Sequence, residues 1–256
     1  MHVLWLTAHP EPRSLNGSLF RDGVRLLREQ GHEVRTSDLY SMNFNPVVTA
    51  DDFSHPADER LIVGRAGQEA VRRRTLAPDI TAEHNKLTWA DTLIVQFPLW
   101  WYGMPAILKG WFDRVFVGGF AFGVRDAQGR QLRYGEGALA GKRAMVIVSA
   151  GAREASLGPR GINGELNELL FPLQHGTLWY AGIDVLPPVL VHGADRMEEA
   201  DYPLRAGMLH QRLEDLPHTK PLPFRRQNGG DYDDDLVLRP ELSPQMTGTA
   251  AHYRSC

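Results

Sequence analysis

Cysteine is almost absent from this chain, whose 256 residues include only Cys256. A single cysteine excludes an intramolecular disulfide and a cysteine-rich metal site, and it is typical of a reducing compartment. No stretch approaches the roughly 18 apolar residues that a transmembrane helix needs. The opening MHVLWLTAHP has no basic segment and does not read as a signal peptide. We therefore expect a soluble, cytoplasmic protein with no integral membrane association.

The sequence also lacks a large excess of charge of either sign, and it lacks the common hydrolase motifs. The formal net charge of −3 gives no reason to expect nucleic acid as a partner. The sequence holds no HExxH, GxSxG or nucleophilic cysteine motif and no metal-ligand cluster, so we expect no metal and no metallohydrolase, serine hydrolase or cysteine hydrolase. The GxxxxGK[ST] and GxGxxG loops are missing too, which argues against triphosphate hydrolysis and a standard dinucleotide site.

Short apolar runs alternate along the chain with segments of helical spacing. Strands are predicted at residues 3–8, 33–38, 92–97, 143–149 and 184–192, the last interrupted by Pro187 and Pro188. Helices are predicted at 16–30, within 58–74, from 79, at 105–116, at 162–173 and at 200–216. This alternation predicts an α/β fold, a flavodoxin-like doubly wound five-stranded parallel sheet with helices on both faces. Residues 1–216 form the expected domain. Residues 217–256, rich in proline, glycine and aspartate, read as an irregular tail.

Ligands of such sheets bind beyond the carboxyl ends of the strands, where three loops of this chain fall. The first loop, HPEPRSLNGS, precedes a helix whose free N–H groups and positive dipole end suit a phosphate. His9 and Arg13 could add donors or charge, and Ser14 and Asn16 lie next to the helix start. Simple helix capping by Ser14 or Asn16 explains the same residues about equally well.

The second loop carries three aromatic residues in a row, Trp100, Trp101 and Tyr102, directly after a buried strand. Such loops lie at the surface, so core packing is a poor explanation for three of them together. A flat, apolar ligand would account for them. The third loop, SAGAREASLGPRGINGE, has small residues whose N–H groups could stabilise negative charge on a ring edge. A flat cofactor and few acid-base groups are typical of flavoenzymes.

The stretch QFPLWWYGMPAILKGWFDRVF, with AHPEPRSLN, SDLYSMNFNPVV and LAPDITAEHNKL, closely resembles the NAD(P)H:quinone oxidoreductase (DT-diaphorase) family over residues 1–215. The resemblance implies FAD, with FMN less expected, NAD(P)H as cosubstrate, a homodimer, and two-electron reduction of a quinone or other small aromatic acceptor in a ping-pong cycle. The tail is a candidate for packing at the dimer interface.

The resemblance also implies site residues, position by position. Those matching the FAD diphosphate segment are His9, Ser14, Leu15 and Asn16, with Arg13 in place of a smaller hydroxyl residue. Those matching the seat of the flavin ring are Pro98, Leu99, Trp101 and Tyr102, to which the run of aromatic residues adds Trp100, and those at its pyrimidine edge are Ser149, Ala150, Gly151 and Ala152. Animal members place a Tyr and a His where this chain has Leu157 and Asn163. We take Asn163, Gly151 and Tyr102 as the candidates for the catalytic step.

Two other functions remain open at this point. One is an FMN-dependent enzyme of azoreductase or nitroreductase type. The other is a flavin-binding regulatory subunit of a potassium efflux system, although the insertion after Tyr40 and the tail after Leu216 resemble the longer catalytic form more. The flavin released on denaturation and turnover of a quinone would separate these possibilities.

Overall fold

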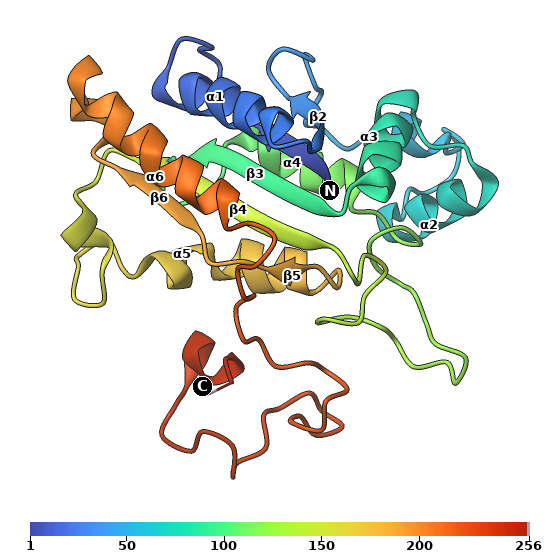
Figure 1. Cartoon of the computed structure of the whole chain (residues 1–256). Coiled ribbons are helices and arrows are strands. Elements are labelled where there is room, and N and C mark those ends of the chain that lie inside the picture. The colour runs from blue at the N-terminus through green and yellow to red at the C-terminus, as the bar shows by residue number, and fades with distance from the viewer. Residues whose placement is uncertain (255–256) are drawn as a thin grey trace.

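The computed structural model describes residues 1–254, so Cys256 lies outside the described residues. Figure 1 shows a twisted sheet covered by helices on both sides, with the tail below it. The strands run in the order β2-β1-β3-β4-β5, and β6 also pairs with β4. All these pairs are parallel. The flavodoxin-like prediction is confirmed. The strands are β1 His2–Thr7, β2 Glu33–Asp38, β3 Thr92–Pro98, β4 Arg143–Ala150, β5 Asp184–Val185 and β6 Val189–His192.

Side chains that alternate along each strand divide the core into two layers. Trp5 and Ile94 face helices α1 and α6, whereas Leu6 and Val95 face α3, α4 and α5 on the other side. Continuous apolar runs such as that of β3 are expected for strands buried on both faces. The helices are α1 Leu15–Glu29, α2 Val63–Arg73, α3 Pro78–Trp89, α4 Ala106–Val115, α5 Leu166–Leu173 and α6 Tyr202–Glu214.

Two predicted elements differ from the structure. The last strand is two strands, because Pro187 and Pro188 separate β5 from β6 and have no N–H groups to donate. The helix expected from residue 162 begins at Leu166, because residues 158–164 form turns that end with Gly164 at φ +83°. Both differences leave the carboxyl ends of β4 and β6 at the same edge of the sheet.

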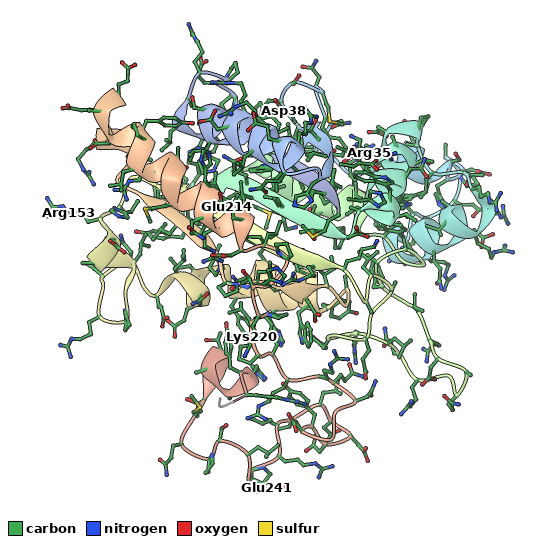
Figure 2. All side chains as sticks on the ribbon, in the orientation of Figure 1. Arg35, Asp38, Arg153, Glu214, Lys220 and Glu241 are labelled. Atoms are coloured by element: carbon green, nitrogen blue, oxygen red, sulfur yellow. The ribbon has the colours of Figure 1, made fainter. Side chains whose placement is uncertain are left out.

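Between residues 217 and 254 the tail consists of turns and a short 3-10 helix, Gly248–His252. Figure 2 shows it leaving the body near Lys220 and reaching its far end at Glu241. The side chain of Arg225 holds the tail together, because it is buried, pairs with Asp231 at 2.9 Å and donates to the carbonyl of Ala251 at 3.1 Å. In the part of the chain described here, no helix is long and apolar enough to cross a membrane.

Candidate functional site

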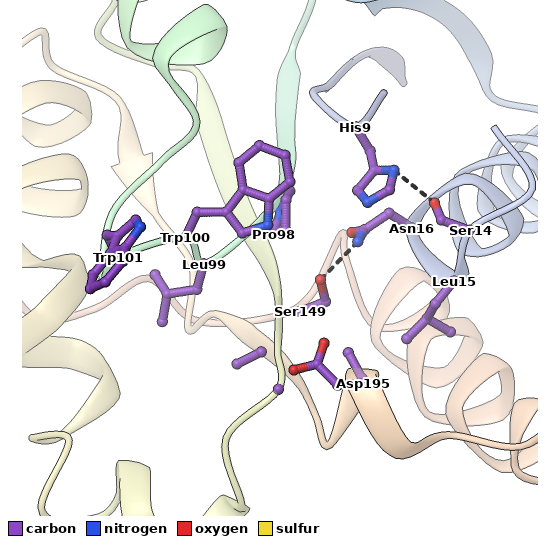
Figure 3. A pocket seen from close by; sticks show the side chains of 13 residues that line it. His9, Ser14, Leu15, Asn16, Pro98, Leu99, Trp100, Trp101, Ser149 and Asp195 are labelled. Atoms are coloured by element: carbon purple, nitrogen blue, oxygen red, sulfur yellow. Dashed lines mark hydrogen bonds between the residues drawn. The ribbon is translucent and has the colours of Figure 1, made fainter. Parts of the chain in front are cut away.

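A pocket of about 440 Å³ lies beyond the carboxyl ends of the strands. All three predicted loops contribute to it, and Figure 3 shows them around one hollow. Its lining consists of His9, Ser14, Leu15, Asn16, Pro98, Leu99, Trp100, Trp101, Ser149, Ala150, Gly151, Ala194 and Asp195. Eleven of these thirteen residues were predicted from the sequence.

Buried polar bonds join the three loops to one another. The amide of Gln96 accepts from Trp5 Nε1 at 2.9 Å and donates to the Asn16 carbonyl at 2.8 Å. Asn16 Nδ2 in turn donates to Ser149 Oγ at 2.8 Å. Gln96 and Asn16 are buried, so leaving any of these groups without a partner would cost about 1–3 kcal/mol. The start of α1 is therefore fixed against β3 and β4.

The α1 end of the pocket is a set of donors. Ser14 is the N-cap of α1, and its Oγ accepts from the N–H of Gly17 at 3.2 Å. The N–H groups of Leu15 and Asn16 belong to the first turn and have no acceptor inside the helix. His9 Nδ1 lies 2.9 Å from Ser14 Oγ and 3.1 Å from the backbone nitrogen of Glu11, so the imidazole ring is fixed beside the start of α1. An anion is the ligand that such an arrangement favours.

Arg13 does not reach this pocket. Its guanidinium pairs with Glu11 at 3.0 Å, and its side chain is otherwise exposed. This hydrogen bond lowers the pKa of Glu11 to about 2. The expected contribution of Arg13 to phosphate binding therefore has no support from the geometry, and none of the residues lining the pocket is an arginine or a lysine.

The opposite wall of the pocket is a turn with an unusual backbone conformation. The N–H of Gly103 donates to the Trp100 carbonyl at 3.0 Å, while Trp101 and Tyr102 between them have φ of +50° and +61°. Two central residues at positive φ make a type I′ turn, which favours asparagine and glycine. Aromatic residues in this conformation cost of order 1–3 kcal/mol each, a strain that clusters at ligand sites. The turn leaves the side chain of Trp101 98% exposed.

Comparison with known proteins gives the family. A family model described as flavodoxin-like fold matches residues 1–212. A Penicillium crustosum protein named ribosyldihydronicotinamide dehydrogenase-like protein traD is 46% identical, over 91% of this chain and 87% of that protein. NAD(P)H dehydrogenase [quinone] 1 of Cavia porcellus is 37% identical, over 95% and 88%. The chain belongs to the NAD(P)H:quinone oxidoreductase family. A Klebsiella pneumoniae crystal structure described as a quinone reductase has a TM-score of 0.95 and 47% identity, with 99% of each chain covered.

The third loop contributes Leu157 and Asn163, the two residues that stand where the resemblance leads us to expect a Tyr and a His. Leu157 is buried and offers no donor. Asn163 is held on both sides, because Tyr102 Oη donates to its Oδ1 at 3.0 Å and its Nδ2 donates to Ser156 Oγ at 3.0 Å. Tyr102 and Asn163 do not line the pocket itself, and neither does Ala152. They instead connect the second loop to the third at its edge.

Sequence reasoning missed Ala194 and Asp195, which belong to the turn after β6. The same rule that selected the other loops applies to them, since β6 also ends at this edge of the sheet. The pattern Val-His-Gly-Ala-Asp at the end of an apolar strand was therefore the sequence signal that could have identified these two pocket residues.

Proposed function

We propose that the protein is an FAD-dependent NAD(P)H:quinone oxidoreductase that reduces quinones by two electrons, with donor and acceptor binding in turn. One observation carries this proposal. The exposed indole of Trp101, on a strained backbone turn, lies across the pocket from the hydrogen-bond donors at the start of α1. A flavin nucleotide has a flat ring at one end and phosphate at the other. The bound flavin would supply hydride chemistry that no side chain of the pocket offers.

The residues divide the work of binding. Leu99, Trp100 and Trp101 offer apolar surface for the ring. The N–H groups of Leu15 and Asn16, with the imidazole of His9 beside them, offer donors for phosphate. The resemblance to the family favours FAD over FMN.

Negative charge that develops at the ring edge during reduction needs fixed donors. Gly151 supplies an N–H in the pocket wall, and Asn163 has a second Nδ2 hydrogen beyond the one given to Ser156. The hydroxyl of Tyr102 orients the Asn163 amide through its hydrogen bond. We assign Gly151 and Asn163 to charge stabilisation and Tyr102 to positioning Asn163.

We also propose that the enzyme is a homodimer. Trp101 and Ile162 are 98% and 96% exposed and lie on adjacent loops, so the mouth of the site carries apolar surface that a second copy would cover. Light scattering on the purified protein tests this point, and a monomer at micromolar concentration would contradict it.

The function is tested by identifying the flavin released on denaturation and by measuring menadione-dependent oxidation of three donors. These donors are NADH, NADPH and N-ribosyldihydronicotinamide, because the names of the curated relatives divide between the last and the nicotinamide dinucleotides. Released FAD together with turnover of at least one donor supports the proposal. Bound flavin without turnover of any quinone would favour a regulatory role instead.

A further inference from the structure

A second cavity lies between the body of the protein and its tail. It measures about 270 Å³, and none of the residues that line it also lines the first pocket. Its walls are formed by Tyr134, Phe171, His175, Gln227, Tyr232, Leu236 and His252. Figure 1 shows the tail below α5, the helix that carries Phe171. The proposed function makes no use of this cavity.

Most of the lining is aromatic. Phe171 stacks on the imidazole of His175, with the ring centroids 4.5 Å apart and an angle of 14° between the planes. Tyr134 lies 5.0 Å from the same imidazole, and Tyr232 stacks on the ring of His252 at 6.0 Å. Such walls favour a flat ligand, which covers a large area and loses little rotational freedom. An apolar cavity of about 150 Å³ already holds benzene, so this one has room for a substituted ring.

Hydrogen-bonding groups interrupt the aromatic surface. The side chain of His175 is buried, and its Nε2 atom has no hydrogen-bond partner within residues 1–254. Tyr232 Oη lies 3.0 Å from His252 Nδ1, so these two groups satisfy each other. The amide oxygen of Gln227 accepts from Arg133 Nε. Since a buried polar atom without a partner is costly, a ligand with a hydrogen-bonding group beside His175 fits better than a hydrocarbon.

None of the residues that line the cavity carries a charge at neutral pH. Burial lowers the pKa of His175 to about 4, and burial together with the charge of Arg225 lowers the pKa of His252. Burial raises the pKa of Tyr232 to about 12, so its hydroxyl keeps the proton. The guanidinium of Arg225 is already paired with Asp231 at 2.9 Å. An ionic ligand would therefore lose its hydration without meeting an opposite charge, and a neutral ligand is favoured.

We propose that this cavity binds a small neutral phenol, whose ring lies among the aromatic side chains and whose hydroxyl is the partner of the His175 imidazole. A phenolic hydroxyl both donates and accepts, so it satisfies a neutral imidazole in either tautomer. The cavity is separate from the proposed flavin pocket, and this inference does not depend on the proposed function.

The test compares phenol with toluene, which has nearly the same shape and lacks the hydroxyl. Each is titrated into the protein as purified, with its own cofactor content, and the ring signals of His252 in histidine-labelled protein report binding by NMR. We expect a dissociation constant for phenol of about 1 mM or below, as the size of the molecule allows. His175→Phe keeps a ring at this position and removes both nitrogens. The ratio of the phenol to the toluene dissociation constant should rise about tenfold in this variant, the size of one hydrogen bond.

A second variant tests the location without changing His175. Leu236→Trp places a larger side chain in the wall and should abolish phenol binding. Val237→Trp is the matched control, because Val237 is the next residue, is exposed like Leu236 and does not line the cavity. Melting temperatures show whether each variant is folded, and if His175→Phe is not, the pair at positions 236 and 237 still decides the site.

Benzoate tests the preference for a neutral ligand. At the concentrations at which phenol binds, benzoate should leave the His252 signals unchanged. Four results would each overturn the inference: no response of the His252 signals to phenol, the same phenol-to-toluene ratio in His175→Phe and wild type, undiminished phenol binding in Leu236→Trp, or benzoate binding as tight as that of phenol.

Discussion

Replacing Trp101 by alanine removes the largest exposed apolar surface of the pocket while leaving the fold in place. The side chain is 98% exposed, so it contributes almost nothing to the packed core. Its only structural demand is on the backbone, where φ is +50°. In a variant that has the same oligomeric state as the wild type by light scattering, a loss of flavin affinity therefore reports contact between the indole and the ligand.

The size of the loss follows from the area that a ring would cover. A tryptophan side chain buries about 150–250 Å² when fully enclosed, and stacking on one face covers roughly half of that. At about 25 cal/mol per Å², about 100 Å² corresponds to roughly 2.5 kcal/mol. The dissociation constant should rise by about 60-fold. The loss of FAD binding free energy in Trp101→Phe should be less than half of the loss in Trp101→Ala.

The assay is a titration of flavin-free protein with FAD, in which the quenching of flavin fluorescence measures binding. Val47→Ala is the control, because Val47 is an exposed apolar residue that does not line the pocket. An affinity for FAD that is the same in Trp101→Ala and wild type would refute the stacking argument.

A second variant at this position separates strain from binding. Trp101→Gly should bind FAD as weakly as Trp101→Ala, but its free energy of unfolding should exceed that of the alanine variant by about 1 kcal/mol. Urea denaturation of the flavin-free proteins measures this difference. Equal stability of the two variants would mean that the positive φ of the turn stores no strain.

Three further predictions concern other parts of the chain. Arg225→Ala removes a buried guanidinium that pairs with Asp231 and donates to the Ala251 carbonyl, and it should cost about 1–3 kcal/mol or release the tail to proteases. Arg254→Ala removes the more exposed partner of the same Asp231 and should cost under about 1 kcal/mol. Burial lowers the pKa of His175 from 6.5 to about 4. As the pH falls from 6.5 to about 4 the unfolded state binds a proton that the folded state does not, so the free energy of unfolding should decrease. His175→Gln should make the free energy of unfolding, measured by urea denaturation, less dependent on pH over this interval. Asn163→Ala should slow anaerobic flavin reduction by up to about a hundredfold, and Tyr102→Phe should slow it less; unchanged stopped-flow rates would exclude both residues from the mechanism.

The architecture was predictable because its signals are local. Continuous apolar runs such as that of β3, bounded by turns, identify strands buried on both faces, and the alternation with helices then leaves few topologies. The start of α5 was harder, because Ile162 continues an apolar spacing although its side chain is 96% exposed in the structure. Periodicity cannot distinguish an apolar residue that faces a core from one that faces a ligand or a second copy.

The site was predictable where several residues share one strand end, as in the loop of Trp100 and Trp101. Single residues were less accessible. Arg13 looked like a phosphate ligand, but its neighbour Glu11 takes the guanidinium, and no pattern in the sequence indicates which partner a long flexible side chain will choose. Asp195 reaches the pocket only because backbone bonds fold its turn against Ala152, which is a contact between distant segments.

The absorbance spectrum of the purified protein, recorded without oxygen, tests the central claim most directly. We predict the visible absorbance band of an oxidised flavin, bleached by one equivalent of NAD(P)H or N-ribosyldihydronicotinamide and restored by one equivalent of menadione. In Trp101→Ala at equal protein concentration the band should be weaker, because less flavin is retained. A protein reconstituted with FAD that shows no bleaching with any of the donors, or no return with the quinone, would contradict the account.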